Sequence, residues 1–336
     1  MWQPLLAGQG EELVKPSTRR RLRWFCGGML AAVVGVNVLA YFHAGAMVNW
    51  VEGEARTEKP ERLGLLERLG VLLTGVSIPR PANRLTPHDV GLPYETHGFP
   101  NGRGVELEAW YVPVEGAPVT SILFHGYAGK KDTMLGVAKG LTQLGSSVLL
   151  VDFYGSGGSS GTGTSLGIHE AYDVAAAVGY ARKHWPGQAL LLYGQSMGGA
   201  TILRAVAKLG VAPDGIVLES TFDRLLATVE SRFHRMGLPA VPFAQLLVFW
   251  GGLRIGGNSW EHNPADYARS VRCPALVLQG DRDPNISSRQ GRSIEAALGG
   301  WKRYAEYTKT GHDDIHASQP ERWKEDVGAL LAEMRG

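Results

Sequence analysis

The sequence predicts an α/β protein with a mostly parallel, doubly wound sheet of about eight strands, a small apolar cap insertion and one N-terminal hydrophobic helix. Three observations predict it: strand-like and helical segments alternate from about residue 94, a glycine-flanked turn joins two of them, and residues 24–42 carry no charge. Such alternation is typical of a parallel sheet covered on both faces. The 336 residues fit one domain of roughly 220–250 residues plus an N-terminal extension.

Composition excludes several classes of function. The formal net charge is only +2, so we expect no nucleic-acid partner. The chain has two cysteines, Cys26 and Cys273, which are far apart and can build neither a disulfide framework nor a metal cluster. We infer no obligate protein partner.

The N-terminal region predicts a single-pass signal anchor. At about 1.5 Å per residue, residues 24–42 are long enough for the roughly 30 Å of a bilayer core. Basic side chains precede this run and mixed charges follow it, so the positive-inside rule makes 1–23 a cytoplasmic tail and the rest of the chain extracytoplasmic. The basic residues are Lys15, Arg19, Arg20, Arg21 and Arg23.

Two alternatives remain for this region. Ala44-Gly45-Ala46 resembles a signal-peptidase site, so cleavage would give a secreted protein. A helix buried in a soluble fold is less favoured, because basic residues flank the uncharged run. In the connector, 43–93, apolar residues at helical spacing predict an amphipathic helix that packs on the main domain or lies on the bilayer. These residues are Leu65, Leu69, Leu72 and Val76.

The main domain is predicted at 94–336, with strands and helices in alternation. The expected strands are 105–114, 120–127, 146–155, 188–195, 214–220, 273–280 and 302–308. The expected helices are 132–144, 168–184, 197–210 and roughly 314–334, and a Gly/Ser-rich loop covers 155–167. Residues 222–265 are apolar and contain no strand, so we expect a cap over the sheet.

The stretch Gly194-Gln195-Ser196-Met197-Gly198 predicts a nucleophile. It matches G-x-S-x-G between a strand and a helix, where the serine stands on a sharp, strained turn at the carboxyl end of the sheet. The two glycines leave room for the close approach of strand and helix. We therefore predict Ser196 as the nucleophile.

A serine hydroxyl needs a base, which follows the nucleophile along the chain in this arrangement. Four histidines follow it: His234, His262, His312 and His316. His312 comes directly after the last strand, so its loop can direct the imidazole toward the sheet edge. We predict His312 as the base.

The strand at 273–280 ends before two candidates for the orienting acid, Asp281 and Asp283. Asp283 is better placed, and Asp281 more simply caps the turn. Glu219 and Asp223 are remote substitutes. For the oxyanion we expect the backbone N–H groups of two further residues, Met197 and Tyr127. His125, on the strand before Tyr127, is expected to support this loop.

Six segments carry a family resemblance: HGYAG, DFYGSGGSSG, GQSMGG, LEST, QGDRDPNI and TGHDD occur in the order seen in α/β hydrolases. The chain resembles membrane-anchored α/β-hydrolase-domain proteins and bacterial lysophospholipase or serine-aminopeptidase-like hydrolases. The resemblance covers 94–334 and implies the α/β-hydrolase fold, no cofactor, and a triad of Ser196, Asp283 and His312. One departure is Pro284, because the family's acid segment usually reads Asp-x-x-Val-Pro.

The resemblance implies a serine hydrolase of carboxylic esters, with a lysophospholipid, monoacylglycerol or acyl-thioester as the small-molecule or lipid acyl substrate. The apolar cap and the anchor favour such substrates. The alternative is a small serine peptidase of aminopeptidase type. A non-enzymatic protein with this fold is disfavoured, because all three triad roles have a candidate residue.

Overall fold

An eight-stranded sheet forms the centre of the protein, in the order β1-β2-β4-β3-β5-β6-β7-β8. The computed structural model describes residues 16–53, 56–58, 64, 66–67, 70–71, 75–312 and 315–334. β2 pairs antiparallel with β1 and β4, and the other pairs are parallel, which confirms the prediction. The strands are β1 (Glu95–Pro100), β2 (Glu106–Val112), β3 (Val119–Phe124), β4 (Ser147–Val151), β5 (Ala189–Gln195), β6 (Gly215–Glu219), β7 (Ala275–Gly280) and β8 (Lys302–Tyr307).

Helices connect the strands and cover the sheet. The α-helices are α1 (Pro16–Val48), α3 (Leu135–Gln143), α4 (Ala171–His184), α5 (Met197–Leu209), α6 (Leu225–Arg235), α7 (Phe243–Ile255), α8 (Pro264–Ala268), α9 (Ser288–Ala297), α10 (Ile315–Ser318) and α11 (Pro320–Glu333). Among the residues that the structure describes, the 3-10 turns are η2 (Pro87–Val90), η3 (Lys131–Met134) and η4 (Ser259–Glu261). Residues 222–265 hold α6 and α7 between β6 and β7, without a strand.

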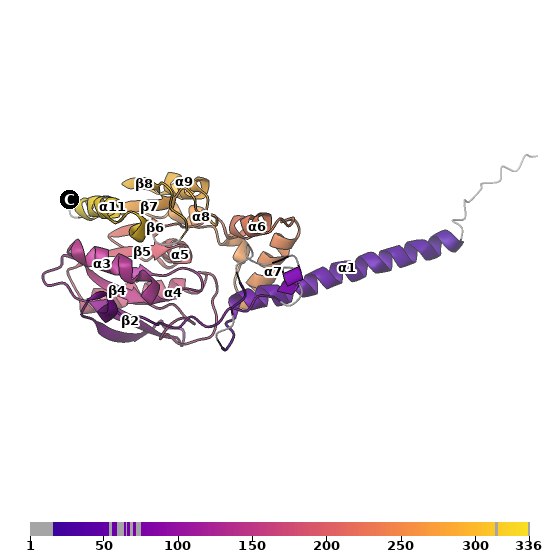
Figure 1. Cartoon of the computed structure of the whole chain (residues 1–336), viewed down its shortest axis with the longest axis horizontal. Helices are drawn as coiled ribbons and strands as arrows, with labels where there is room; N and C mark the ends of the chain where they lie inside the picture. The colour runs from indigo at the N-terminus through magenta and orange to yellow at the C-terminus, as the bar shows by residue number, and fades with distance from the viewer. Residues whose placement is uncertain are drawn as a thin grey trace, which may run out of the picture.

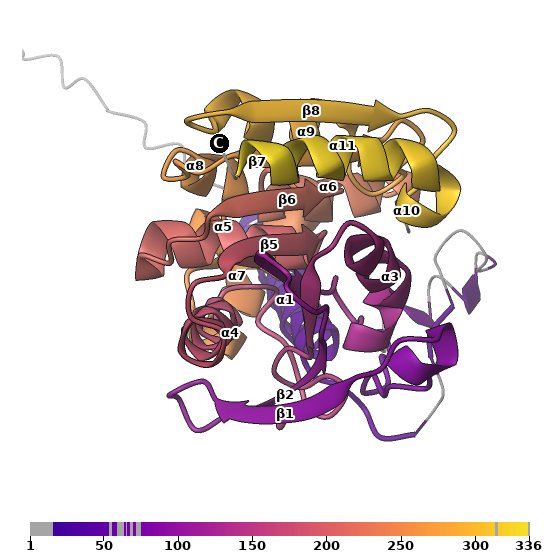
Figure 2. The ribbon, with the colours of Figure 1, turned by 90° about the vertical axis from the view of Figure 1, so that its left-hand side faces the viewer.

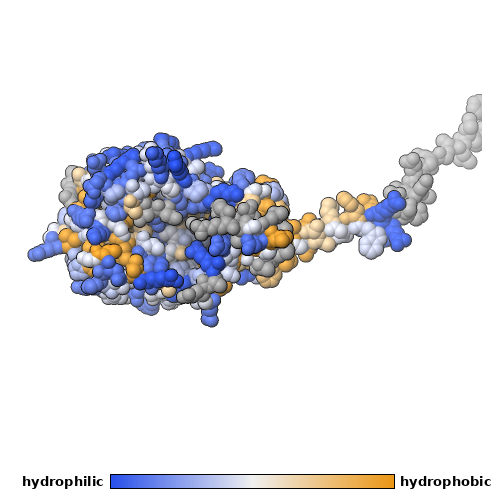
Figure 3. All heavy atoms as spheres, viewed as in Figure 1, coloured by the Kyte–Doolittle hydropathy of each residue, from blue (hydrophilic) through white to orange (hydrophobic). Residues whose placement is uncertain are grey.

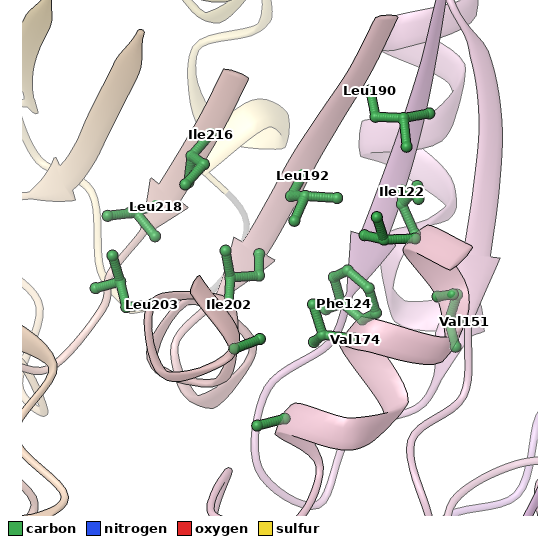
Figure 4. Packing of buried hydrophobic residues seen from close by; sticks show 14 of the residues in the cluster. Ile122, Phe124, Val151, Val174, Leu190, Leu192, Ile202, Leu203, Ile216 and Leu218 are labelled. Carbon is green, nitrogen blue, oxygen red and sulfur yellow. The ribbon is translucent and has the colours of Figure 1, made fainter. Parts of the chain in front are cut away.

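Alternate residues of the buried strands pack on opposite faces of the sheet. In β5, Leu190 and Leu192 join the cluster beneath α4 and α5, whereas Leu191 and Tyr193 join the cluster beneath α3 and α11. Figure 4 shows Leu190 and Leu192 beside strand residues such as Ile122 and helix residues such as Ile202. Helices cover both faces of the sheet (Figure 2), and the central strands are accordingly largely apolar, as in β5.

The strand order creates a topological switch point between β3 and β5. β3 lies between β4 and β5, so the chain crosses back over β3 before it forms β5. The loops after β3 and β5 therefore leave toward opposite faces, and ligands of open α/β sheets bind at such a switch point. β1 was not among the strands expected from sequence, because its Gly98 and Pro100 suit only an edge strand. The single helix expected at 314–334 is two, α10 and α11.

The N-terminal helix extends well beyond the main body. α1 begins before the predicted segment 24–42 and continues past it to Val48. Its first part projects away from the sheet (Figure 1) and carries exposed apolar side chains (Figure 3), among them Phe25 and Leu30. Among the described residues, Arg19–Val48 is the one helix long and apolar enough to cross a membrane, by length and composition.

The second part of α1 packs against α7 of the cap (Figure 1). Trp250 Nε1 donates to Asn37 Oδ1 at 3.2 Å, and the Trp250 ring meets the Tyr41 ring edge-on at 5.5 Å. Ala44 is 2% exposed. The segment that resembles a cleavage site is thus partly buried in a helix. The residues Leu65, Leu69 and Leu72, on which the predicted connector helix depends, lie outside the described residues.

A buried lysine links the loop after β3 to β4. The side chain of Lys131 is fully buried and donates to Asp152 and, at 2.6 Å, to Glu108. It lies 4.2 Å from the centre of the Trp110 ring. Burial favours the neutral form of Asp152, but the nearby Lys131 and His125 outweigh it, so the pKa of Asp152 is lowered.

Lys131→Met is expected to lower the free energy of unfolding by about 3–5 kcal/mol, because it leaves the buried Asp152 carboxylate without its cationic partner. Denaturant unfolding of the full chain in detergent measures this change. The control is Lys324→Met, which removes a surface ion pair with Glu321 and should cost about 0–1 kcal/mol. Equal losses in the two variants would contradict the prediction.

Candidate active site

Ser196 stands at the apex of the turn between β5 and α5. Its φ of 52° and ψ of −112° are strained for a residue with a Cβ, and it is the residue before the first turn of α5. Its N–H donates to the Glu219 carbonyl at 2.7 Å, which ties the turn to the end of β6. Strained non-glycine residues of this kind are concentrated at functional sites in proteins, so the conformation agrees with the role expected for Ser196.

The two glycines of the motif are required by close backbone contacts. A Cβ on Gly194 would lie 2.4 Å from the Gly199 nitrogen, and one on Gly198 would lie 2.2 Å from the Phe124 carbonyl oxygen. Neither backbone group can move without displacing α5 or β3. The glycines on either side of Ser196 are thus explained by the close approach of α5 to β5 and β3 at the carboxyl end of the sheet.

The structure brings Asp283 and His312 together. Asp283 follows β7 and His312 follows β8. Because these neighbouring strands are parallel, both residues lie at the carboxyl end of the sheet. The Asp283 Oδ2 to His312 Nδ1 distance is 2.8 Å, with the Asp283 side chain fully buried and the His312 side chain 18% exposed. A buried carboxylate on Nδ1 holds the imidazole in the tautomer that leaves Nε2 able to accept a proton.

The backbone after Asp283 holds its carboxylate in place. Asp283 Oδ1 accepts from the N–H groups of Asn285 and Ile286 at 2.8 and 2.9 Å. Gln279 Nε2 lies 3.4 Å from Oδ2. The intervening Pro284 has no N–H and fits the first position of such a turn, so the departure from the family pattern is accommodated. These donors are not apparent from the sequence, although Asp-Pro-Asn is a turn signal.

The competing acids lie in other environments. Asp281 is exposed and its Oδ1 accepts from the Thr310 N–H at 3.3 Å. The Glu219 carboxylate accepts from the Tyr193 hydroxyl and, at 3.1 Å, from Gln195 Nε2. The observed contact of His312 thus favours Asp283 over both.

The loop after β3 lies beside Ser196. A Cβ on Gly126 would be 3.5 Å from the Ser196 Cβ, so the backbone leading into Tyr127 borders the nucleophile turn. Met197 is the first residue of α5, where N–H groups have no partner within the helix. Both expected oxyanion donors therefore come from segments that meet at the β3–β5 switch point.

Two buried histidines have structural contacts. His125 Nε2 accepts from the Phe153 N–H at 3.2 Å, and burial lowers its pKa. His262 Nε2 contacts the Leu166 carbonyl at 3.0 Å, whereas its Nδ1 has no hydrogen-bond partner in the described part of the chain. Burial lowers the pKa of His262 to about 3. Both histidines thus contact backbone groups, whereas His312 contacts the carboxylate of Asp283.

The contribution of His262 to stability is expected to fall as the pH drops below about 6.5. His262 stays neutral in the folded protein down to about pH 3, whereas the unfolded chain binds a proton near 6.5. The unfolded state thus gains up to about 1.4 kcal/mol per pH unit, or about 2 kcal/mol between pH 6.5 and 5. In His262→Gln, whose amide can still donate to Leu166, denaturant unfolding should show a pH dependence weaker by about this amount. An unchanged dependence would contradict the prediction.

Within the ranges that the structure describes, no group of three or more His, Cys, Asp or Glu side chains is arranged to hold a metal ion.

The strand order and the strained turn after β5 are those of the α/β-hydrolase fold. Residues 119–254 match the family described as serine aminopeptidase, S33. The Pyrococcus furiosus esterase Pf2001 has the same fold, with a TM-score of 0.65 at 23% identity over 77% of this chain and 97% of the esterase. The resemblance to α/β hydrolases is thereby confirmed.

Two curated relatives match a smaller share of this chain. An uncharacterised protein of Mycobacterium tuberculosis is 28% identical over 221 residues, 63% of this chain and 69% of the relative. Lysophosphatidylserine lipase ABHD12 of Xenopus tropicalis is 24% identical over 206 residues, 58% of this chain and 50% of the lipase. The chain thus spans about half of the lipase. Together the comparisons support a hydrolase.

Proposed function

We propose that the protein is a serine hydrolase that cleaves carboxylic esters through an acyl-enzyme. The observation that carries this proposal is the 2.8 Å contact between Asp283 and His312 at the sheet edge where Ser196 stands on its strained turn. Two of the three proposed triad side chains, Asp283 and His312, are therefore in contact. The third, Ser196, stands on a strand-to-helix turn of the kind that exposes a nucleophilic serine in this fold.

The proposed reaction has two halves. His312 takes the proton of Ser196 as the hydroxyl oxygen attacks the ester carbonyl, and the N–H groups of Met197 and Tyr127 stabilise the oxyanion. The protonated imidazole then gives its proton to the leaving alcohol. A water molecule, deprotonated by His312, attacks the acyl-enzyme, and the proton returns to Ser196 as the acid product leaves. Asp283 stabilises the imidazolium in both halves.

Lipid-like acyl substrates are the proposed class: a lysophospholipid, a monoacylglycerol or an acyl-thioester. The cap places apolar residues on α6 and α7, and Phe249 and Leu253 of α7 are exposed. The similarity to a lysophosphatidylserine lipase supports the same class. A small serine peptidase of aminopeptidase type is the second candidate, supported by the family match over 119–254.

We further propose that α1 anchors the protein as a signal anchor, with the basic N-terminus cytoplasmic. Its exposed apolar side chains and the flanking arginines support a membrane span. α7 packs beside residues Asn37 and Tyr41, so it would lie near the extracytoplasmic surface of the bilayer. The packing of Ala44 within α1 supports an uncleaved anchor rather than a signal peptide.

The test is a substrate panel on the purified full chain in detergent. p-Nitrophenyl esters of short and long acyl chains are compared with aminoacyl p-nitroanilides, and labelling by a fluorophosphonate reports the reactive serine. We expect labelling and faster turnover of the esters, with long chains preferred. Faster turnover of the anilides would favour the peptidase, and absence of both labelling and turnover would contradict a serine hydrolase.

A further inference from the structure

The end of α1 is built into the catalytic domain. The backbone around Val48 and Trp50 pairs with the Gly/Ser-rich loop, with Trp50 N–H donating to the Thr162 carbonyl at 2.9 Å and Thr164 N–H to the Val48 carbonyl at 2.8 Å. Val48 is 5% and Trp50 is 8% exposed. A tether that only held the enzyme near a membrane would not need this burial.

The same turn of α1 holds the side chain of Tyr127. The Tyr127 hydroxyl donates to the Met47 carbonyl at 2.5 Å, and the Tyr127 ring lies 5.9 Å from the Trp50 ring. The carbonyl of Met47 belongs to the last turn of the helix, where such groups have no partner within the helix. The Tyr127 hydroxyl therefore satisfies a carbonyl at the end of α1. In return, α1 restrains the position of the Tyr127 side chain in the loop after β3.

The loop that carries Tyr127 contains a strained residue beside the nucleophile turn. Its next residue, Ala128, has a φ of 53°, a strained conformation that persists only when surrounding contacts impose it. Burial raises the pKa of Tyr127 to about 12, so the hydroxyl stays protonated and can donate at any pH at which the hydrolase would work. Gly126 of the same loop borders Ser196.

We propose that the last turn of α1 positions the oxyanion site: the Met47 carbonyl holds the Tyr127 side chain, and thereby the backbone N–H of Tyr127 beside Ser196. This inference rests on the proposed function. Tyr127 acts in it twice, through its backbone N–H on the reacting oxygen and through its hydroxyl as the link to α1. α1 then contributes to the geometry of the active site. Cleavage of the chain after Ala46 would therefore impair catalysis as well as membrane attachment.

The test is Tyr127→Phe in the full-length protein in detergent, with kcat divided by the number of active sites titrated with a fluorophosphonate. The variant keeps the backbone N–H and the ring but loses the bond to Met47. We expect kcat per titrated site to fall by at least about 10-fold, since a displacement of about 1 Å can cost about 100-fold. KM for a p-nitrophenyl ester should stay within about two-fold, because uniform binding is unchanged.

The matched control is Tyr180→Phe, which removes a hydroxyl bonded to His97 Nδ1 at 2.7 Å at the far edge of the sheet. It should leave kcat per site unchanged. As a second variant, Asn49→Ala removes an exposed side chain that bonds the Gly45 carbonyl at 2.8 Å in the last turn of α1. It should lower kcat in the same direction as Tyr127→Phe, and by less.

Fewer titrated sites with an unchanged kcat per site would overturn the inference, because the hydroxyl would then serve folding alone. Equal kcat per site in Tyr127→Phe and wild type would overturn it too, and would leave the proposed function intact. A wild-type protein that neither reacts with the fluorophosphonate nor hydrolyses the ester would overturn both.

Discussion

Ser196→Ala is expected to abolish fluorophosphonate labelling and to lower kcat for p-nitrophenyl esters by about 10⁴–10⁶-fold. The substitution removes the attacking oxygen but leaves the turn, the Asp283–His312 pair and the proposed oxyanion donors. Residual turnover from these groups would be independent of an acyl-enzyme, so pre-steady-state measurements should show no burst. A variant that retains labelling would show that another serine reacts.

Ser196→Gly separates the chemical role of this residue from its backbone strain. Glycine adopts the φ of 52° and ψ of −112° without the strain of a Cβ, which is of order 1–3 kcal/mol. Its larger entropy in the unfolded chain offsets about 0.4–1 kcal/mol of that gain. We expect Ser196→Gly to be inactive and at least as stable as Ser196→Ala by thermal unfolding. A less stable glycine variant would mean that the turn is not strained.

Asp283→Asn is expected to lower kcat by about 10⁴-fold with the fold retained. The present carboxylate accepts from His312 and from two backbone N–H groups, those of Asn285 and Ile286. An amide has only one acceptor oxygen, so its NH₂ group must face either the histidine or the two backbone donors. Facing His312, it would stabilise the wrong tautomer. Steady-state kinetics together with thermal unfolding measures both effects.

Asp281→Asn is the control for this substitution. Asp281 is exposed and its amide replacement can still accept from the Thr310 N–H, so kcat should change by no more than about two-fold. The reverse result, with Asp281→Asn inactive and Asp283→Asn active, would assign the acid role to Asp281. That outcome would contradict the Asp283 assignment made from the observed contact.

The sequence predicted the central parallel strands because they are short, largely apolar runs, as in β5 and β7. It predicted the turn at Ser196 because Gly194 and Gly198 mark a close approach that other residues cannot make. It did not identify β1, whose exposed residues carry little hydrophobic pattern. Nor did it predict the burial of Lys131, because pairing with Asp152 and Glu108 depends on segments far apart in the chain.

The amino-acid sequence alone identified candidate residues for the chemistry and their order along the chain, since hydrophobic periodicity and glycine spacing are local properties. Only the tertiary structure decided which carboxylate meets His312, because Asp281 and Asp283 differ by two positions and only their surroundings distinguish them. It also decided that α1 ends against Tyr127, a contact across 80 residues that no local pattern encodes. Such contacts depend on how whole elements pack, and packing is a property of the folded chain.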